Sequence, residues 1–220
     1  MLNILFPKIC IGCSELLVGR EETLCASCRN ALPLSCHHRR DDEAFKRIFY
    51  GRIPLQNATA LLQFQKKGLT QLLLHKLKYK NQEKLSAFFG AWLGAELSEI
   101  PSYQNIDMVI PVPLHKKRLR KRGYNQVAGF GKEIAKALHT SYRDDILVKK
   151  RKNNSQVFKK RSMRFQATPV FSVVTTSELE NKHILLVDDI VTTGATLENC
   201  AQQLLASPTT QLSVATMAIA

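Results

Sequence analysis

Two adjacent carboxylates, Asp188 and Asp189, separate an apolar run from a turn that is rich in hydroxyl groups. The run Ile184–Val187 contains only leucine and β-branched residues, which is typical of a strand buried on both faces of a parallel sheet. The turn Thr192–Thr196 follows, and a helical pattern begins at Leu197. A strand, a tight turn and a helix start gather N–H groups, hydroxyls and the positive end of a helix dipole. The sequence therefore predicts an α/β fold with a phosphate-binding site.

The carboxylate pair next to this turn indicates which phosphate the site would bind. Carboxylates accept hydrogen bonds from a ribose diol, directly or with Mg²⁺, so ribose 5-phosphate matches both parts of the motif. One of the two aspartates could instead be a structural carboxylate that caps a neighbouring loop. We expect Asp188 and Asp189 to bind the sugar and the turn to bind the 5′-phosphate. The predicted phosphate-binding residues are Thr192, Thr193, Gly194, Ala195 and Thr196.

A second strand, loop and helix are predicted between residues 106 and 138. The strand Ile106–Ile110 should stop at Pro111, because proline cannot donate to a sheet ladder. The segment His115–Gln126 then brings six cations within eight residues, and a helix should follow from Val127 to Leu138. Loops at the carboxyl ends of parallel strands share one edge of the sheet, so this basic loop could bind the far end of the same ligand. Arginine offers bidentate geometry to phosphate oxygens. The predicted pyrophosphate-binding residues are Arg118, Lys121 and Arg122.

The positive charge of the protein is concentrated in this region. The net charge is +14, and the 50 residues from His115 to Arg164 hold 17 of the 32 Lys and Arg but only three of the 18 Asp and Glu. In the rest of the chain, 15 basic residues balance 15 acidic residues. Such a concentration favours a face that binds a polyanion, although a solvated basic surface without a ligand is the alternative.

Four cysteines near the N-terminus form two Cys-x-x-Cys pairs separated by eleven residues. Each pair lets two thiolates face one ion, and four thiolates match the tetrahedral preference of zinc. We therefore predict a structural zinc site in residues 1–36, with Cys10, Cys13, Cys25 and Cys28 as ligands. Cys36, His37 and His38 are adjacent and lack a second cysteine pair, so they are interpreted as surface or packing residues.

The remaining segments suggest how these parts are connected. Residues 37–60 are interpreted as a linker that leads into the edge of the core, which would comprise residues 61–220. Helical spacing of leucine and aromatic residues predicts helices over 63–77 and 84–97. For Lys78 a solvated helix end is preferred over a phosphate contact. For Asn125 and Gln126 a helix start is preferred over a contact with ribose or Mg²⁺-bound water. A cationic excursion between strands in residues 145–174 is a candidate flap over the site, with Gln156 and Arg161 as the residues to test.

Composition places the chain among ordinary folded proteins. It has 220 residues, of which 45% are hydrophobic and 23% charged. The N-terminus lacks a basic region followed by a long apolar stretch, and no apolar run approaches a membrane span. We therefore expect a cytoplasmic protein without membrane insertion.

The motif at 184–197 resembles the phosphoribosyl-pyrophosphate (PRPP) motif of type I phosphoribosyltransferases. The whole chain resembles the ComF/GntX family, in which a cysteine knuckle module is joined to such a domain. The stretches that carry this resemblance are the two cysteine pairs, Leu77–Tyr79, Pro111–Leu114, Arg122–Gln126, Gln156 with Arg161, and the 184–197 motif.

The resemblance implies a parallel-sheet core of the type I phosphoribosyltransferase kind and a ligand such as PRPP with Mg²⁺. It further implies phosphoribosyl transfer to an unknown acceptor, with release of pyrophosphate. Members of the family are linked to DNA uptake, which implies possible partners in single-stranded DNA and DNA-uptake proteins. Two alternatives stay open: an accessory protein for competence without turnover, and a zinc-stabilised interaction protein.

Overall fold

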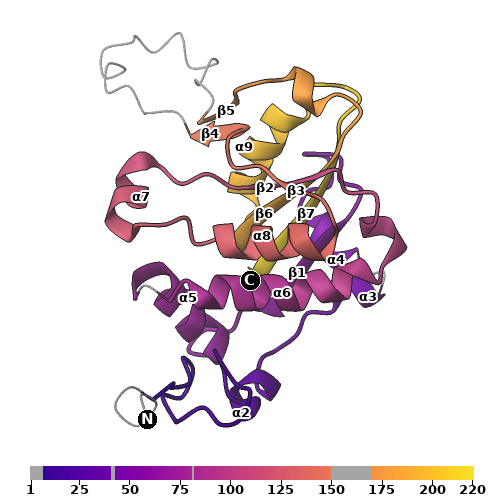
Figure 1. Cartoon of the computed structure of the whole chain (residues 1–220). Helices are drawn as coiled ribbons and strands as arrows, with labels where there is room; N and C mark the ends of the chain where they lie inside the picture. The colour runs from indigo at the N-terminus through magenta and orange to yellow at the C-terminus, as the bar shows by residue number, and fades with distance from the viewer. Residues whose placement is uncertain (1–6, 41–42, 81, 150–169) are drawn as a thin grey trace.

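The computed structural model describes residues 7–40, 43–80, 82–149 and 170–220. Its centre is a five-stranded sheet with the strand order β1-β7-β6-β2-β3, in which every neighbouring pair is parallel (Figure 1). Strands β4 (Leu147–Lys149) and β5 (Phe171–Val173) form a separate antiparallel pair. The strands of the central sheet are β1 (Ala58–Gln63), β2 (Met108–Pro111), β3 (Ser141–Tyr142), β6 (His183–Val191) and β7 (Gln211–Ile219).

The predicted parallel α/β core is confirmed, but strand β6 is longer than the sequence suggested. The apolar run predicted a strand that stops at Val187, whereas β6 continues to Val191 and contains both aspartates. The continuation is paired with β7, where Asp188 lies beside Thr216 and Ile190 beside Ala218. Strand β7 is buried over eight of its nine residues, and its ladder extends β6 past the polar pair.

Helices cover both faces of the sheet and create two hydrophobic cores. On one face lie α5 (Leu69–Tyr79), α6 (Lys84–Ser98) and α8 (Ala128–Ala137). On the other face, α9 (Ala195–Leu204) packs with the β4–β5 pair. The chain leaves β2 towards β3 through α8 and leaves β6 towards β7 through α9. The gap between β2 and β6 is therefore the point at which the strand order reverses, where open α/β sheets bind their ligands.

The helices α6 and α8 pack closely because glycines line their contact. A Cβ atom on Gly90 would lie 2.5 Å from the Phe130 carbonyl oxygen, and one on Gly94 would lie 2.9 Å from the Ala137 Cβ. Ser86, buried on α6, donates to the Gln126 carbonyl at 2.6 Å and accepts from the Phe130 N–H at 2.9 Å. These contacts hold α8 and the residue Gln126 before it against α6.

The basic segment after β2 forms a helix rather than the predicted loop. Helix α7 spans Lys116–Arg122, and its arginine, lysine and leucine residues are good helix formers. The His115 side chain caps its start by accepting from the Lys117 N–H at 3.2 Å. Gly123, at φ +80°, ends it in the left-handed conformation that glycine adopts readily. Figure 1 shows α7 standing out from the body of the molecule.

Residues 37–60 contain two short helices, α3 (His37–Arg40) and α4 (Ala44–Arg47), before β1 begins at Ala58. Phe45 and Phe49 are fully buried in the core on the α9 side of the sheet. This segment therefore contributes part of the hydrophobic core.

The cysteine pairs lie at the opposite end of the molecule from the β4–β5 pair (Figure 1), next to α2 (Ala26–Asn30). Lys76 on α5 donates to the Ile11 carbonyl at 2.5 Å and connects this region to the core. Among the described residues, no helix has both the length and the apolar character needed to cross a membrane.

Candidate phosphate and ribose site

The candidate site lies where β2 ends and β6 continues without it. The last ladder pair joins Pro111 to Val187, and the Val112 N–H donates to the Val187 carbonyl at 2.9 Å. Beyond this point β6 keeps β7 as its neighbour on one side only. The Asn125 side chain donates to the Val112 carbonyl at 3.2 Å and holds the departing chain. Asp188 and Asp189 therefore stand at the carboxyl edge of the sheet, beside the gap between β2 and β6.

The two aspartates point to opposite faces of the sheet, because successive side chains of a strand alternate. Asp189 faces the side of α5 and α8, where it contacts Lys78 and Gln126. Asp188 lines the hollow beneath the threonine turn on the α9 side. Both residues belong to the same edge of the sheet, but their surroundings differ.

Asp189 is buried, and both of its carboxylate oxygens have partners. Oδ1 lies 3.1 Å from the Lys78 ammonium, and Oδ2 accepts from the Gln126 amide at 2.7 Å. A buried carboxylate requires such partners, since an unpaired charge is costly away from water. Lys78 comes from the end of α5 and Gln126 from the segment before α8, so three elements meet at this carboxylate.

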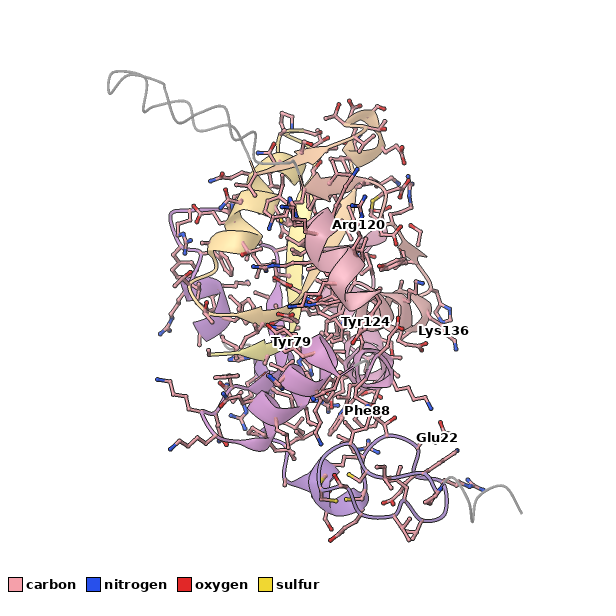
Figure 2. The ribbon with its side chains drawn as sticks, turned by 90° about the vertical axis from the view of Figure 1, so that its left-hand side faces the viewer. Glu22, Tyr79, Phe88, Arg120, Tyr124 and Lys136 are labelled. Atoms are coloured by element: carbon pink, nitrogen blue, oxygen red, sulfur yellow. The ribbon has the colours of Figure 1, made fainter. Side chains whose placement is uncertain are left out.

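Gln126 connects the carboxylate to the basic helix. Its side-chain oxygen accepts from Arg122 at 2.6 Å while its amide donates to Asp189. The Arg122 guanidinium also lies 5.4 Å from the centre of the Tyr79 ring, a cation–π distance. Figure 2 shows Tyr79 and Tyr124 on the same face of the molecule as Arg120. One end of α7 is thus connected to the carboxyl edge of β6.

The surroundings of Asp188 favour an ionised carboxylate less than those of Asp189 do. Burial, together with the negative charge of the adjacent Asp189, raises the pKa of Asp188 to about 8. The Asp189 N–H donates to Asp188 Oδ1 at 2.8 Å, and the positive charges of Lys78 and Lys149 act in the opposite direction. A carboxyl group with this pKa takes up a proton near neutral pH unless a cation balances its charge.

The turn after β6 forms a small hollow of about 60 Å³. Gly194 precedes α9 with φ +75° and is buried. A Cβ atom there would lie 2.6 Å from the Phe49 ring, so only glycine fits this position. The residues around it are exposed. They are Thr192, Thr193, Ala195 and Thr196.

The predicted pyrophosphate-binding residues differ in their placement. Arg122 is half-buried and joined to Asp189 through Gln126. Arg118 and Lys121 lie on the exposed surface of α7. The predicted flap residues Gln156 and Arg161 lie outside the described residues.

Lys78, Gln126 and Lys149 were not among the site residues predicted from the sequence. Lys78 was interpreted as a solvated helix end and Gln126 as a helix start, whereas both contact Asp189. Lys149, at the end of β4, lies 4.8 Å from the centre of the Phe171 ring and acts on Asp188. Lys78 and Gln126 lie in two of the stretches that carry the family resemblance, Leu77–Tyr79 and Arg122–Gln126, whereas Lys149 lies in none of them.

The four N-terminal cysteines form a compact cluster. Their sulfur atoms all lie within 4.8 Å of one another, and three of the four residues are buried. Burial opposes ionisation of Cys10, but N–H groups of Cys25, Cys13 and Gly12 outweigh it and lower its pKa to about 6. Four thiols this close can hold a tetrahedral metal ion. Gly12 lies against this cluster, since a Cβ there would be 2.7 Å from the Cys28 sulfur.

The other cysteine and histidine residues have different surroundings. His38 is hydrogen-bonded to Thr59 at 2.8 Å and to Glu96 at 2.7 Å, which joins α3, β1 and α6. Cys200 is fully buried on α9 in the hydrophobic core. Among the described residues, the four-cysteine cluster is the only set of three or more His, Cys, Asp or Glu that could hold a metal.

A larger hollow lies away from the aspartates. It measures about 1070 Å³ and runs between the cysteine region and α6, where Figure 2 labels Glu22 and Phe88. Its lining carries charges of both signs, such as Arg29 and Glu133. The smaller hollow at β6 combines a carboxylate, hydroxyls and a helix start, so we consider it the candidate site.

The sequence is similar to proteins of known families. The family described as "Phosphoribosyl transferase domain" matches residues 128–218. DNA utilization protein YhgH of Escherichia coli O157:H7 is 26% identical over 90% of this chain and 84% of that protein. Competence protein ComFC of Bacillus subtilis is 25% identical over 90% and 78%. ComFC of Streptococcus pneumoniae is 33% identical, over 56% of this chain and only 50% of the relative.

Solved structures of phosphoribosyltransferases are also similar. Glutamine PRPP amidotransferase of B. subtilis, solved with ADP and GMP, matches 60% of this chain and 26% of its own at 22% identity, with a TM-score of 0.42. The matched range, residues 128–218, includes α8, the 184–197 motif and most of β7. The chain is therefore a homologue of ComFC and YhgH that matches the phosphoribosyl transferase domain family over residues 128–218 and has an N-terminal four-cysteine cluster, in agreement with its resemblance to the ComF/GntX family.

Proposed function

We propose that this protein binds PRPP, or a related ribose phosphate, with Mg²⁺ and transfers the phosphoribosyl group to an acceptor. The observation that carries the proposal is the placement of Asp188 and the threonine turn around one hollow, at the reversal of strand order between β2 and β6. A ligand with a phosphate beside a ribose diol matches this arrangement.

Each part of the ligand has a proposed contact. The turn from Thr192 to Thr196 would hold the 5′-phosphate, and Asp188 and Asp189 would orient the ribose hydroxyls. Arg122 is the cation best placed for the pyrophosphate, because Gln126 ties it to Asp189. Arg118 and Lys121 on α7 would approach from the exposed side, and Gln156 and Arg161 remain proposed flap residues.

The surroundings of the aspartates fit a magnesium ion. Carboxylate oxygens are hard ligands of the kind that Mg²⁺ prefers, and the raised pKa of Asp188 indicates a place where added positive charge is favourable. Asp188 would hold the ion together with phosphate or ribose oxygens of the ligand. When bound, Mg²⁺ would neutralise charge on the departing pyrophosphate.

The reaction would replace one bond at the ribose C1 atom. The bond from C1 to the pyrophosphate oxygen breaks, and its electron pair leaves with pyrophosphate. A lone pair of the acceptor forms the new bond to C1. Positive charge develops on the sugar between these events, and the carboxylates of Asp188 and Asp189 would stabilise it. Arg122 would stabilise the leaving group, and the turn would keep the phosphate end fixed.

We propose zinc as the metal of the four-cysteine cluster. Four thiolates and no open position are typical of a structural zinc site, which stabilises the fold without taking part in the reaction. A boundary between this module and the rest of the chain at residue 36 stays a prediction.

Calorimetry with PRPP and Mg²⁺ tests the proposed ligand. We expect micromolar binding to the wild-type protein and its loss in the Asp188→Asn/Asp189→Asn variant. Asp145→Asn, which removes a carboxylate paired with Arg143 on the surface, is the matched control and should bind as the wild type does. Wild-type protein that shows no heat with PRPP and Mg²⁺ would contradict the proposal.

A second candidate function is an accessory role in DNA uptake without turnover. The names of the relatives, the net charge of +14 and the exposed basic helix α7 favour this reading. Binding to single-stranded DNA through its phosphates would weaken steeply with salt. Salt-sensitive affinity for single-stranded DNA without any affinity for PRPP would favour the accessory role over the enzyme.

A further inference from the structure

Residues 48–52, which follow helix α4, lie against the turn that would hold the 5′-phosphate. Phe49 is buried, and its ring approaches the Gly194 Cα so closely that a Cβ would lie 2.6 Å away. Ile48 lies on the same side, 3.0 Å from that Cβ position. This segment is more than 130 positions away from the turn in the sequence, yet it forms the wall on which the turn rests.

Arg52 completes this wall with hydrogen bonds to the turn itself. One terminal nitrogen donates to the Thr193 carbonyl at 2.8 Å and to the Ile48 carbonyl at 2.9 Å. Its Nε donates to the Glu198 carboxylate at 3.0 Å, and its other terminal nitrogen contacts the same oxygen. The side chain is one-third exposed, and Glu198 is 23% exposed. One guanidinium therefore joins the wall, the turn and the first turn of α9.

The bond to Thr193 fixes the direction of a peptide group. A trans peptide is planar, so its N–H points opposite to its C=O. Because the Thr193 carbonyl points to Arg52, the N–H of Gly194 points to the opposite side of the turn. This orientation suits a turn that must present N–H groups to an anion on the side away from Arg52.

The ion pair between Arg52 and Glu198 affects the charge at the start of α9. Glu198 stands in the first turn of α9, the same helix end that would receive a doubly charged phosphate. A free carboxylate there would repel the phosphate. Arg52 pairs with this carboxylate and cancels its charge.

From these contacts we propose that Arg52 is a positioning residue of the phosphate site: it holds the Thr193–Gly194 peptide in its anion-binding orientation and neutralises Glu198. This proposal depends on the proposed function, because it assumes that the turn binds a ribose 5′-phosphate. Arg52 itself does not contact the ligand.

Calorimetry with ribose 5-phosphate on single and double variants tests the role of Arg52. Arg52→Met should weaken binding by about tenfold or more, because the Thr193 carbonyl loses the hydrogen bond that orients its peptide and Glu198 loses the partner that cancels its charge. Arg52→Lys keeps the positive charge but loses the planar guanidinium that donates to several acceptors at once, so this variant should bind ribose 5-phosphate with intermediate affinity. Glu198→Gln should bind at least as tightly as the wild type, and Arg52→Met/Glu198→Gln should recover part of the loss.

Two controls separate positioning from simple stabilisation of the fold. Inorganic pyrophosphate, which would bind near Arg122, should bind Arg52→Met as it binds the wild type. Arg143→Met, which breaks an ion pair with Asp145 and Glu178 away from the turn, should leave ribose 5-phosphate binding unchanged.

Three results would overturn the proposal. Equal ribose 5-phosphate affinity in wild type and Arg52→Met removes the role of Arg52 and leaves the proposed function standing. Equal losses in Arg52→Met and Glu198→Gln show a structural ion pair instead of charge neutralisation. Absence of binding of both ribose 5-phosphate and PRPP to the wild type overturns the inference together with the proposed function.

Discussion

The Lys78 ammonium lies 3.1 Å from the buried carboxylate of Asp189, and Gln126 donates to the other oxygen of that carboxylate at 2.7 Å. The second aspartate of the motif is therefore held by protein groups on both oxygens. A ribose hydroxyl that contacts Asp189 would have to share these oxygens with Lys78 or Gln126. Helix α5 and the segment before α8 thus fix the position of a side chain on β6.

Removal of the Lys78 charge should destabilise the protein. We expect Lys78→Met to lower the free energy of unfolding by about 1–3 kcal/mol, because it leaves a buried carboxylate short of a partner. Lys78→Met/Asp189→Asn should recover much of that loss. Urea unfolding followed by circular dichroism measures both. As the control, Lys182→Met breaks a more exposed pair with Asp107 and should cost less than about 1 kcal/mol. Equal effects at the two sites would contradict the importance of burial at Asp189.

Gly194→Ala should affect both stability and phosphate binding. The positive φ and the contact with Phe49 should together cost roughly 2–4 kcal/mol, and the shifted turn should lose ribose 5-phosphate. Gly19 also has a positive φ, +59°, but a Cβ there would meet open space. Gly19→Ala should therefore lower the free energy of unfolding only through backbone strain, by about 1 kcal/mol, and should bind ribose 5-phosphate as the wild type does. Thermal unfolding and calorimetry on both variants check this, and a Gly194→Ala protein as stable as Gly19→Ala would disprove the steric argument.

The raised pKa of Asp188 predicts a pH-dependent effect of its removal. Its pKa is about 8 in the folded protein against an ordinary value of 3.8, so the folded state binds one more proton between these values. Stability from this group is then full below pH 4 and falls as the pH rises towards 8. Asp188→Asn should be more stable than the wild type at pH 8 and equal to it near pH 4. Chemical unfolding at pH 4, 6 and 8 without added Mg²⁺ measures this difference. A constant difference at all three values would show that Asp188 is not perturbed.

The four-cysteine cluster should carry one metal ion per chain. Cys25→Ser should lower the metal content and the thermal midpoint, because a structural metal stabilises the fold that holds its ligands. Elemental analysis of purified protein gives the stoichiometry. Cys36→Ser, outside the cluster, should retain the metal. Retention of a full equivalent of metal by Cys25→Ser would contradict the assignment of the ligands.

The sequence was sufficient for the features that depend on neighbouring residues. The cysteine spacing predicted a compact cluster, and the sulfur atoms do lie within 4.8 Å of one another. Apolar runs and helical spacing predicted the strands and helices of the core, because periodicity reflects which side of an element is buried. The helix predicted over 84–97 is confirmed as α6, Lys84–Ser98.

The tertiary structure decided which residues meet at the site. The sequence could not show that β6 extends to Val191, because the pairing that extends it comes from β7, later in the chain. Nor could it show that Lys78 reaches Asp189 or that Arg52 reaches Thr193, since more than 100 residues separate each pair. A charged side chain has no local signal for a partner that is distant in the sequence. Its partner depends on how helices and strands pack, and that packing is set by the whole core.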